Sequence, residues 1–430
     1  MTDALALQLA EIRAAGQAAA ALDGGVRTAA LRRFADLVDS RRADLLAANR
    51  RDLDEQAGRI EDALYQRLKL GDGKIDALVT GVRQLADRPD PVGTSLGRTL
   101  LDDDLVLTKV AVPIGVIGVV FESRPDVIPQ ILSLVLRSGN VAVLKGGREA
   151  LHSNRAFMQL VGELNREIGE LPERWATLFE TREEIRAILD YPEYVDLVIP
   201  RGSNQLVRSI QESTRIPVLG HAEGVCHVYV HPSADMAKAV DVAIDSKVQY
   251  PSACNALETL LVDGECAAEF LPRFAEVAGP AGITIRGCER TRSVLPDVDH
   301  ATDDDWRTEF GDLRLSVRVV DGLDAAIDHI HRFGSGHTDC VVAEDETICE
   351  SFLRRVDSAS VFANASTRFA DGFRYGLGAE VGISTNKTHA RGPVGVEGLM
   401  IYKYQLRGAG QVVRNYAGTD ARAFRHEPLS

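Results

Sequence analysis

The fold is decided by residues 116–144, which read VIGVVFESRPDVIPQILSLVLRSGNVAVL. The apolar run at residues 116–121 predicts a buried strand, and residues 127–136 predict a helix. A Gly-Asn pair at residues 139–140 then predicts a turn into a second buried strand at residues 141–144. Strands that alternate with helices indicate a parallel sheet covered on both faces, so we expect an α/β fold.

The same alternation continues along the chain and resumes after Cys254 as a second α/β unit. The further strands that we expect lie at residues 194–199, 259–262, 283–285 and 315–320, and the further helices at residues 151–168, 207–212, 266–277 and 323–332. The first ninety residues have helical periodicity. Residues 96–112 are rich in β-formers around an Asp-Asp-Asp turn and predict a projecting hairpin, and residues 392–413 return to strand-like composition.

Composition excludes several classes of protein. The chain has 430 residues and a formal net charge of −14, which argues against nucleic acid or an anionic membrane as the main partner. Its six cysteines include no CxxC pair, which favours a reducing compartment. The N-terminal segment does not resemble a signal peptide, and no run of eighteen apolar residues occurs. We therefore expect a cytoplasmic protein that does not span a membrane.

One cysteine has a setting that packing does not require. Residues 251–255 read Pro-Ser-Ala-Cys-Asn and precede an apolar run, so Cys254 is expected at a turn. A thiol near free backbone N–H groups can have a lowered pKa and act as a nucleophile. The alternative is a buried structural cysteine.

Polar residues follow three of the predicted strands. Lys145 and Gly146 end one strand, and residues 200–203, Pro-Arg-Gly-Ser, end a later one and open a helix. Ligands of open α/β sheets bind at these ends, and helix N-termini favour anions, so a dinucleotide site is expected although no GxGxxG is present. Arg201 would suit the extra phosphate of NADP. Arg124 ends the first strand and would face the same cleft. The alternatives are a solvated lysine, an ordinary serine N-cap and a surface turn.

Histidines at positions 329, 331 and 337 lie near Asp339 and Cys340. A metal site would need ligands at a regular spacing, which this stretch lacks. We therefore expect no metal.

Three stretches carry a resemblance to a known family: residues 113–125 (PIGVIGVVFESRP), residues 251–255 and residues 320–339 (VDGLDAAIDHIHRFGSGHTD). Together they resemble the aldehyde dehydrogenase superfamily and, within it, the γ-glutamyl phosphate reductase family. The resemblance implies an aldehyde dehydrogenase-like fold with two parallel-sheet α/β domains. It implies a cofactor-binding domain at residues 1–95 and 113–245, a catalytic domain at 246–391, and an oligomerisation hairpin and tail at 96–112 and 392–413.

The resemblance also implies roles for single residues. Cys254 matches the nucleophile, Lys145 the lysine on the cofactor ribose, and Gly202 and Ser203 the pair near the pyrophosphate. Glu309 falls where the superfamily has a glutamate on the nicotinamide ribose, and Asn364 lies in a loop near the active site. The cofactor implied is NADPH/NADP.

The reaction implied is NADPH-dependent reduction of L-glutamyl 5-phosphate to L-glutamate 5-semialdehyde and phosphate through a cysteine thioester, the second step of proline biosynthesis. A homo-oligomer and a transient contact with glutamate 5-kinase are implied partners. The alternative is an oxidative, water-using aldehyde dehydrogenase. Two motifs of that class are changed here, at residues 122–125 and 218–224. Arg124 is a candidate for the departing phosphate or for the substrate carboxylate, and the sequence does not choose.

Overall fold

The computed structural model describes residues 3–220 and 223–429. The chain packs into two compact units. Unit 1 consists of Met1–Leu219, Leu377–Val381 and Val394–Ser430, and unit 2 of Gly220–Gly376 and Gly382–Pro393. The two units are defined by how the chain packs. The domain roles predicted from the sequence remain predictions.

Unit 1 is built on a four-stranded parallel sheet in the order β5-β4-β3-β6. Its strands are β3 (Val116–Phe121), β4 (Val141–Gly146), β5 (Ala176–Leu178) and β6 (Leu197–Arg201). Every residue of β3 and β4 is buried, as expected for strands covered on both faces. The carboxyl end of β3 pairs Phe121 with Gly146 on one side and with Arg201 on the other, so the three predicted polar stretches end at one edge.

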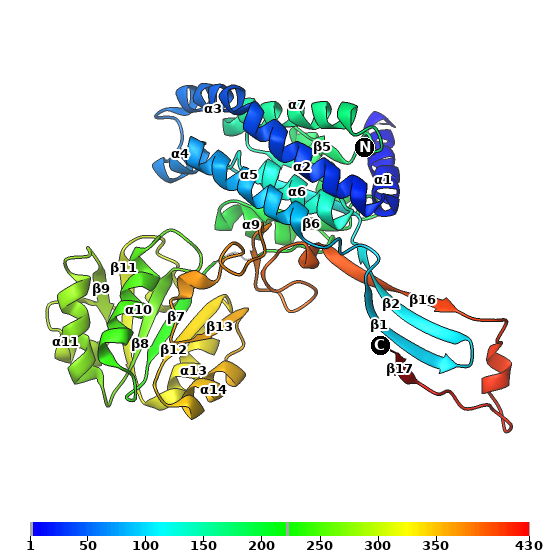
Figure 1. The fold of residues 1–430 in the computed structure, drawn as a ribbon. Helices are drawn as coiled ribbons and strands as arrows, with labels where there is room; N and C mark the ends of the chain where they lie inside the picture. The colour runs from blue at the N-terminus through cyan, green and yellow to red at the C-terminus, as the bar shows by residue number, and fades with distance from the viewer. Residues whose placement is uncertain (1–2, 221–222, 430) are drawn as a thin grey trace. The chain divides into compact units, whose positions relative to one another are not determined.

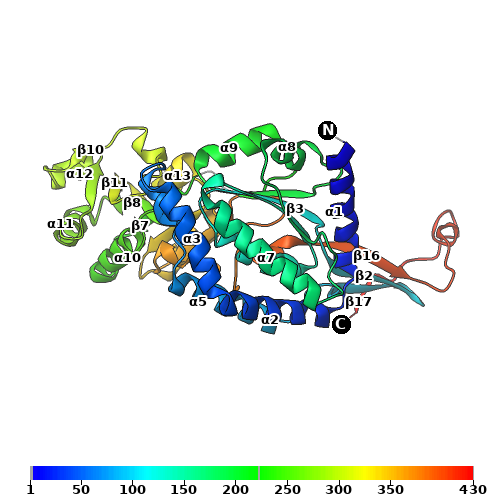
Figure 2. The same ribbon diagram turned by 90° about the horizontal axis from the view of Figure 1, so that it is seen from above.

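The helices of unit 1 surround this sheet (Figures 1 and 2). They are α1 (Asp3–Ala21), α2 (Gly24–Ser40), α3 (Arg42–Gln56), α4 (Asp62–Leu68), α5 (Asp72–Asp87), α6 (Val127–Ser138), α7 (Leu151–Glu167), α8 (Arg182–Asp190) and α9 (Asn204–Ser213). Helices α2 and α6 each contact α5, α7 and one another, and α1 and α6 contact β4. None of the helices in the described part of the chain is long and apolar enough to cross a membrane.

Unit 2 contains a seven-stranded parallel sheet in the order β10-β9-β11-β8-β7-β12-β13. Its strands are β7 (Cys226–Val230), β8 (Leu257–Asp263), β9 (Thr284–Gly287), β10 (Asp299–His300), β11 (Arg314–Val320), β12 (Thr338–Val342) and β13 (Ser360–Ala363). Its helices are α10 (Met236–Val248), α11 (Ala267–Ala278), α12 (Glu289–Val294), α13 (Gly322–Phe333) and α14 (Glu346–Arg355). A short ribbon joins β14 (Ile383–Ser384) to β15 (Gly392–Pro393).

The alternation of side chains along β7 divides the core of unit 2 in two. Val228 and Val230 belong to the cluster that includes residues of α10 and α11. Tyr229, between them, belongs to the cluster that includes residues of α13 and α14. Successive side chains of a strand point to opposite faces, so these helix pairs cover opposite faces of the sheet, as Figure 1 shows. The α/β class expected from the sequence is confirmed.

An antiparallel sheet projects from unit 1 (Figure 1). The hairpin of β1 (Ser95–Asp102) and β2 (Leu105–Pro113) forms where the sequence predicted one. It is extended by β16 (Met400–Arg407) beside β2 and by β17 (Glu427–Leu429) beside β1. We call these four strands the arm. The sequence predicted a strand-like tail around β16 but missed β17.

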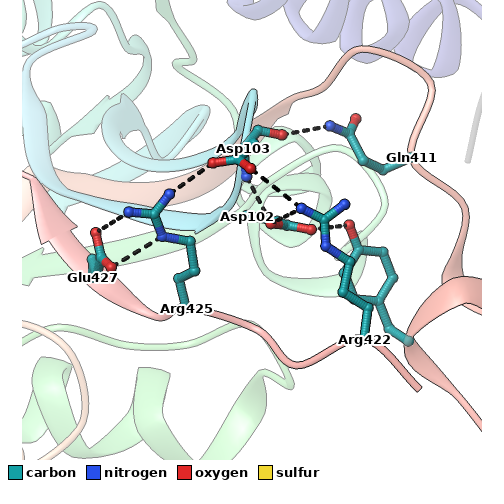
Figure 3. A network of polar contacts seen from close by, with 7 residues as sticks. Asp102, Asp103, Gln411, Arg422, Arg425 and Glu427 are labelled. Carbon is teal, nitrogen blue, oxygen red and sulfur yellow. Dashed lines mark hydrogen bonds and ion pairs between the residues drawn. The ribbon is translucent and has the colours of Figure 1, made fainter. Parts of the chain in front are cut away.

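Ion pairs fasten the hairpin turn of the arm to the C-terminal segment (Figure 3). The buried Asp102 carboxylate accepts hydrogen bonds from the Tyr416 hydroxyl at 2.7 Å and from Arg422 at 2.8 Å. Arg425 bridges Asp103, at 2.7 Å, and Glu427, at 2.9 Å. The hydrogen bond from Tyr416 is the first cause of a lowered pKa at Asp102. These contacts fix the course of the chain between β16 and β17.

Candidate active site

Cys254 lies in the loop between α10 and β8 of unit 2, and its side chain is half-buried. Two turns shape the loop: the Ala253 amide donates to the Tyr250 carbonyl, and the Ala256 amide donates to the Ala253 carbonyl. The amides of Cys254 and Asn255 have no acceptor among the described residues. Two N–H groups are therefore left beside the thiol, which is the arrangement that stabilises a developing oxyanion.

The other cysteines differ from Cys254 in burial or in the hydrogen bonds of the sulfur. Cys226, Cys266, Cys340 and Cys349 are buried, and burial raises the pKa of each, to about 11 at Cys266 and about 12 at Cys340. Cys288 is half-buried, and there burial acts to raise the pKa, but hydrogen bonds from Thr291 and the Val319 amide outweigh it and lower the pKa. Its sulfur is engaged as the N-cap of α12, whereas Cys254 caps no helix.

Backbone packs directly against backbone behind Cys254. A β-carbon added to Gly224 would lie 1.9 Å from the Cys254 carbonyl oxygen, so only glycine fits there. The same Cys254 carbonyl accepts a hydrogen bond from the Cys226 thiol at 3.3 Å. The Gly224 amide donates to the Glu309 carboxylate at 2.9 Å. Glu309, predicted from the resemblance, is therefore linked through one glycine to the loop that carries Cys254.

A buried ion pair, which the sequence analysis did not identify, supports the same loop. Lys247 Nζ, in the last turn of α10, lies 2.7 Å from Glu258 Oε2 at the start of β8, and both side chains are fully buried. The Gly311 amide, two residues after Glu309, also donates to Glu258, at 3.3 Å. Burial raises the pKa of Glu258 to about 7 and lowers the pKa of Lys247. The pair thus connects α10, β8 and the loop of Glu309.

Asn364 follows β13 in a left-handed conformation, with φ 56°. Its side-chain oxygen accepts from the Ala343 amide at 3.0 Å, and its side-chain nitrogen donates to the Ala343 carbonyl at 2.8 Å. Both ends of the amide group therefore hold the neighbouring chain after β12. Its predicted place in the catalytic site remains a prediction.

The remaining predicted residues lie at the carboxyl edge of the sheet in unit 1. Lys145 is buried and donates to the Gly146 carbonyl at 2.6 Å, and no carboxylate of the described residues lies within ion-pair distance of it. Burial lowers its pKa. A β-carbon at Gly146 would lie 2.2 Å from Asn154, and one at Gly202 would lie 2.5 Å from Glu122. A β-carbon at either position would therefore displace the neighbouring side chain.

Ser203 is the N-cap of α9, and its hydroxyl accepts from the Leu206 amide. The Ser203 amide donates to the Glu122 carboxylate at 2.9 Å, so any anion at this terminus would compete with Glu122. Arg124 is half-buried in the loop after β3 and follows Ser123, whose φ is 44°. The Glu149 carboxylate accepts hydrogen bonds from the Ser123 amide, at 2.6 Å, and from the Ser123 hydroxyl, at 3.0 Å.

His227 and His329 are parts of a packed network around Asp339, whereas His331 is exposed. His227 Nδ1 lies 2.7 Å from Asp339 Oδ1, and both side chains are completely buried. The ring of His329 meets that of His227 edge-on, and burial lowers the pKa of His329 to about 2. The described residues contain no cluster of three His, Cys, Asp or Glu side chains that could hold a metal ion.

Comparison with known proteins gives concordant matches. The family model described as "Aldehyde dehydrogenase family" matches residues 5–283. γ-Glutamyl phosphate reductase of Natronomonas pharaonis is 54% identical over 403 residues, covering 92% of this chain and 91% of that protein. The corresponding protein of Methanosarcina mazei is 49% identical over 420 residues, covering 95% and 94%.

A solved structure agrees with these matches. The crystal structure of γ-glutamyl phosphate reductase from Thermotoga maritima has a TM-score of 0.91 and 39% sequence identity, over 95% of this chain and 100% of that chain. A propionaldehyde dehydrogenase from Clostridium phytofermentans, 14% identical with a TM-score of 0.65, shares the fold alone. The chain belongs to the γ-glutamyl phosphate reductase family of the aldehyde dehydrogenases.

Proposed function

We propose that this chain reduces L-glutamyl 5-phosphate to L-glutamate 5-semialdehyde and phosphate, the second step of proline biosynthesis from glutamate. The observation that carries the proposal is the loop of Cys254. It combines a half-buried thiol that caps no helix, two amides without acceptors, and a backbone contact that links it to Glu309. The names of the relatives supply the substrate class.

In the first step the Cys254 thiolate attacks the acyl carbon of the substrate. The sulfur–carbon bond forms, and the bond from carbon to the phosphate oxygen breaks, so phosphate leaves with the electron pair. The negative charge that develops on the carbonyl oxygen accepts hydrogen bonds from the amides of Cys254 and Asn255. The product of this step is a thioester on Cys254.

The family uses a nicotinamide cofactor, which when bound supplies the hydride that reduces the thioester carbonyl. We assign its binding in unit 1 to Lys145, Gly146, Arg201, Gly202 and Ser203. The role of Glu309 at the nicotinamide ribose remains a prediction from the resemblance. The buried Lys145, which has no carboxylate partner among the described residues, fits such a ligand. We propose NADPH as the cofactor, because Arg148 and Arg201 can supply positive charge to its 2′-phosphate.

The exposed edge of the arm supports a homo-oligomer. Among the described strands, β16 pairs with β2 alone, and Ile401, Tyr402, Tyr404 and Leu406 of β16 are exposed large apolar side chains. An unpaired apolar edge strand is normally covered by another chain, and we propose a second copy. All six cysteines are free, which supports a reducing compartment such as the cytoplasm. A contact with glutamate 5-kinase remains a prediction.

The reverse reaction tests the proposal. NADPH formation from glutamate semialdehyde should require inorganic phosphate, and arsenate should replace it, because the thioester needs an acceptor. Cys254→Ala should lower turnover by at least about 1000-fold, while Cys288→Ser should retain it. A rate that is independent of phosphate, with free glutamate as product, would establish the water-using alternative instead.

A further inference from the structure

Arg368 is a buried arginine without a carboxylate partner. It lies in the 3₁₀ turn η3 (Thr367–Phe369) of unit 2 and is 7% exposed. Its Nε donates to the neutral Gln249 side chain at 2.9 Å, and its guanidinium carbon lies 5.8 Å from the centre of the Tyr250 ring. Within residues 3–220 and 223–429, no carboxylate lies within ion-pair distance of it. A buried charge normally has such a partner, so this one requires an explanation.

The turn that carries Arg368 is tied to both sides of the Cys254 loop. On the N-terminal side of the loop, Ser246 in α10 accepts from the Thr367 amide at 3.1 Å and contacts the Ser366 hydroxyl at 3.2 Å. On its C-terminal side, the Asn255 side chain donates to the Ala370 carbonyl at 2.8 Å. These contacts place Arg368 next to the loop and restrain its backbone there.

The charged side chains around Arg368 are one cation, Arg374, and two carboxylates, Asp371 and Asp245, neither of which lies within ion-pair distance of it. Arg374 donates to the Arg368 carbonyl at 2.6 Å, is itself exposed, and has no ion pair among the described residues. Burial lowers the pKa of Arg368, the charge of Arg374 adds to this, and the thiolate of Cys254 opposes it. Asp371 has one carboxylate oxygen engaged by the amides of Phe373 and Arg374. The Arg368 guanidinium therefore lies near enough to the reacting thiol to interact with its charge, Arg374 contacts the Arg368 backbone, and neither arginine has an ion pair within the described residues.

We propose that Arg368, with Arg374 beside it, binds an oxyanion of the substrate next to Cys254. An arginine can hold a phosphate or a carboxylate through two parallel hydrogen bonds, and burial strengthens such contacts. The substrate in the proposed function carries both groups: the phosphate on the reacting carbon and the α-carboxylate at the other end. The inference rests on that function for its substrate but not for the existence of the anion site.

Alkylation of Cys254 tests the anion site without turnover. Iodoacetate and iodoacetamide react with the same thiolate, but only iodoacetate carries a negative charge. In Arg368→Gln, the ratio of the iodoacetate rate to the iodoacetamide rate at Cys254, followed by mass spectrometry, should fall by about tenfold. A change in thiolate content affects both reagents equally and leaves the ratio unchanged. Arg391→Gln is the matched control, because Arg391 of the same unit is already paired with Asp357 at 2.9 Å.

Steady-state kinetics in the reverse direction then identifies the anion. A rise of about tenfold or more in KM for phosphate in Arg368→Gln assigns the site to the departing phosphate, and the same rise in KM for glutamate semialdehyde assigns it to the carboxylate. Arg368→Lys should recover part of the loss. An unchanged alkylation ratio, or two unchanged KM values, overturns the proposal. Absence of phosphate-dependent turnover in the unmodified protein would overturn the proposed function, while the alkylation ratio would still decide the anion site.

Discussion

Two buried cations flank the loop of Cys254, and they differ in what they contact. Lys247 has the Glu258 carboxylate at 2.7 Å, whereas Arg368 has the neutral Gln249 side chain at 2.9 Å and no carboxylate within ion-pair distance in the part of the chain that the structure describes. In a buried ion pair, the attraction between the two charges offsets the cost of removing them from water. Removing one partner should therefore lower the stability of the fold. An unpaired charge is available to a ligand, so its removal should affect binding. Both cations are buried, so burial does not tell a stabilising charge from a ligand-binding charge. The difference lies in whether the partner is a carboxylate, as for Lys247, or a neutral amide, as for Arg368.

Lys247→Met should have the largest effect on stability, because it leaves the Glu258 carboxylate buried without a cation beside it. Breaking a buried pair costs about 3–5 kcal/mol of the free energy of unfolding. The measurement is denaturant unfolding of unit 2, followed by the fluorescence of Trp306, which lies in that unit. The double variant Lys247→Met/Glu258→Leu removes both charges and should recover most of the loss. Equal losses in the single and double variants would contradict a charge-based role.

Glu258→Gln should remove a pH dependence of stability. Burial raises the pKa of Glu258 from its ordinary 4.5 to about 7, so between these values the folded protein holds a proton that the unfolded chain has lost. The stabilisation from this proton is complete below pH 4.5 and is lost as the pH rises through about 7. The measurement is the melting temperature of the native chain and of Glu258→Gln from pH 5 to 8. The melting temperature should fall with rising pH for this reason only in the native chain, and the matching change in the free energy of unfolding should be at most about 3 kcal/mol.

Gly224→Ala should impair catalysis more than stability. The new β-carbon would lie 1.9 Å from the Cys254 carbonyl oxygen, so the loop must move. A displacement of about 1 Å at a reacting group can lower kcat about 100-fold. The control is Gly169→Ala, since nothing in the structure lies within 4 Å of a β-carbon there. A variant at position 224 with native kcat would show that the loop position is not critical.

Gln249→Glu should have the smallest effect and is the most direct test of the comparison. It would give Arg368 the carboxylate partner that Lys247 has, at the position where Nε now meets the Gln249 oxygen. The internal carboxylate would compete with the substrate anion, and the relevant KM should rise about 3- to 10-fold with little change in melting temperature. Gln249→Leu, which removes the contact without adding charge, should change KM less than the glutamate variant does.

The fold was predictable because its signals are local. The apolar strand and helix at residues 116–144 and the repeated alternation after Cys254 gave the two parallel sheets. The turn around Cys254 was predictable from its residues, and the catalytic role of Cys254 remains a prediction. Glu258 had a weak signal, as an acidic residue inside an apolar run, but its partner Lys247 lies on another element. Arg368 had no local signal, because its significance depends on which charges the fold keeps away from it.

The arm joins strands that lie far apart in the sequence. Strand β17 covers the outer edge of β1, and Arg422 reaches an aspartate 320 residues earlier. During synthesis the first hairpin therefore emerges long before residues 427–429 exist, and all strands of both parallel sheets are made in the interval. An uncovered β edge can pair with other nascent chains. Production of this protein should consequently depend on how the cell shields that edge until the last strand arrives, and slower synthesis of the C-terminal third should increase aggregation rather than reduce it.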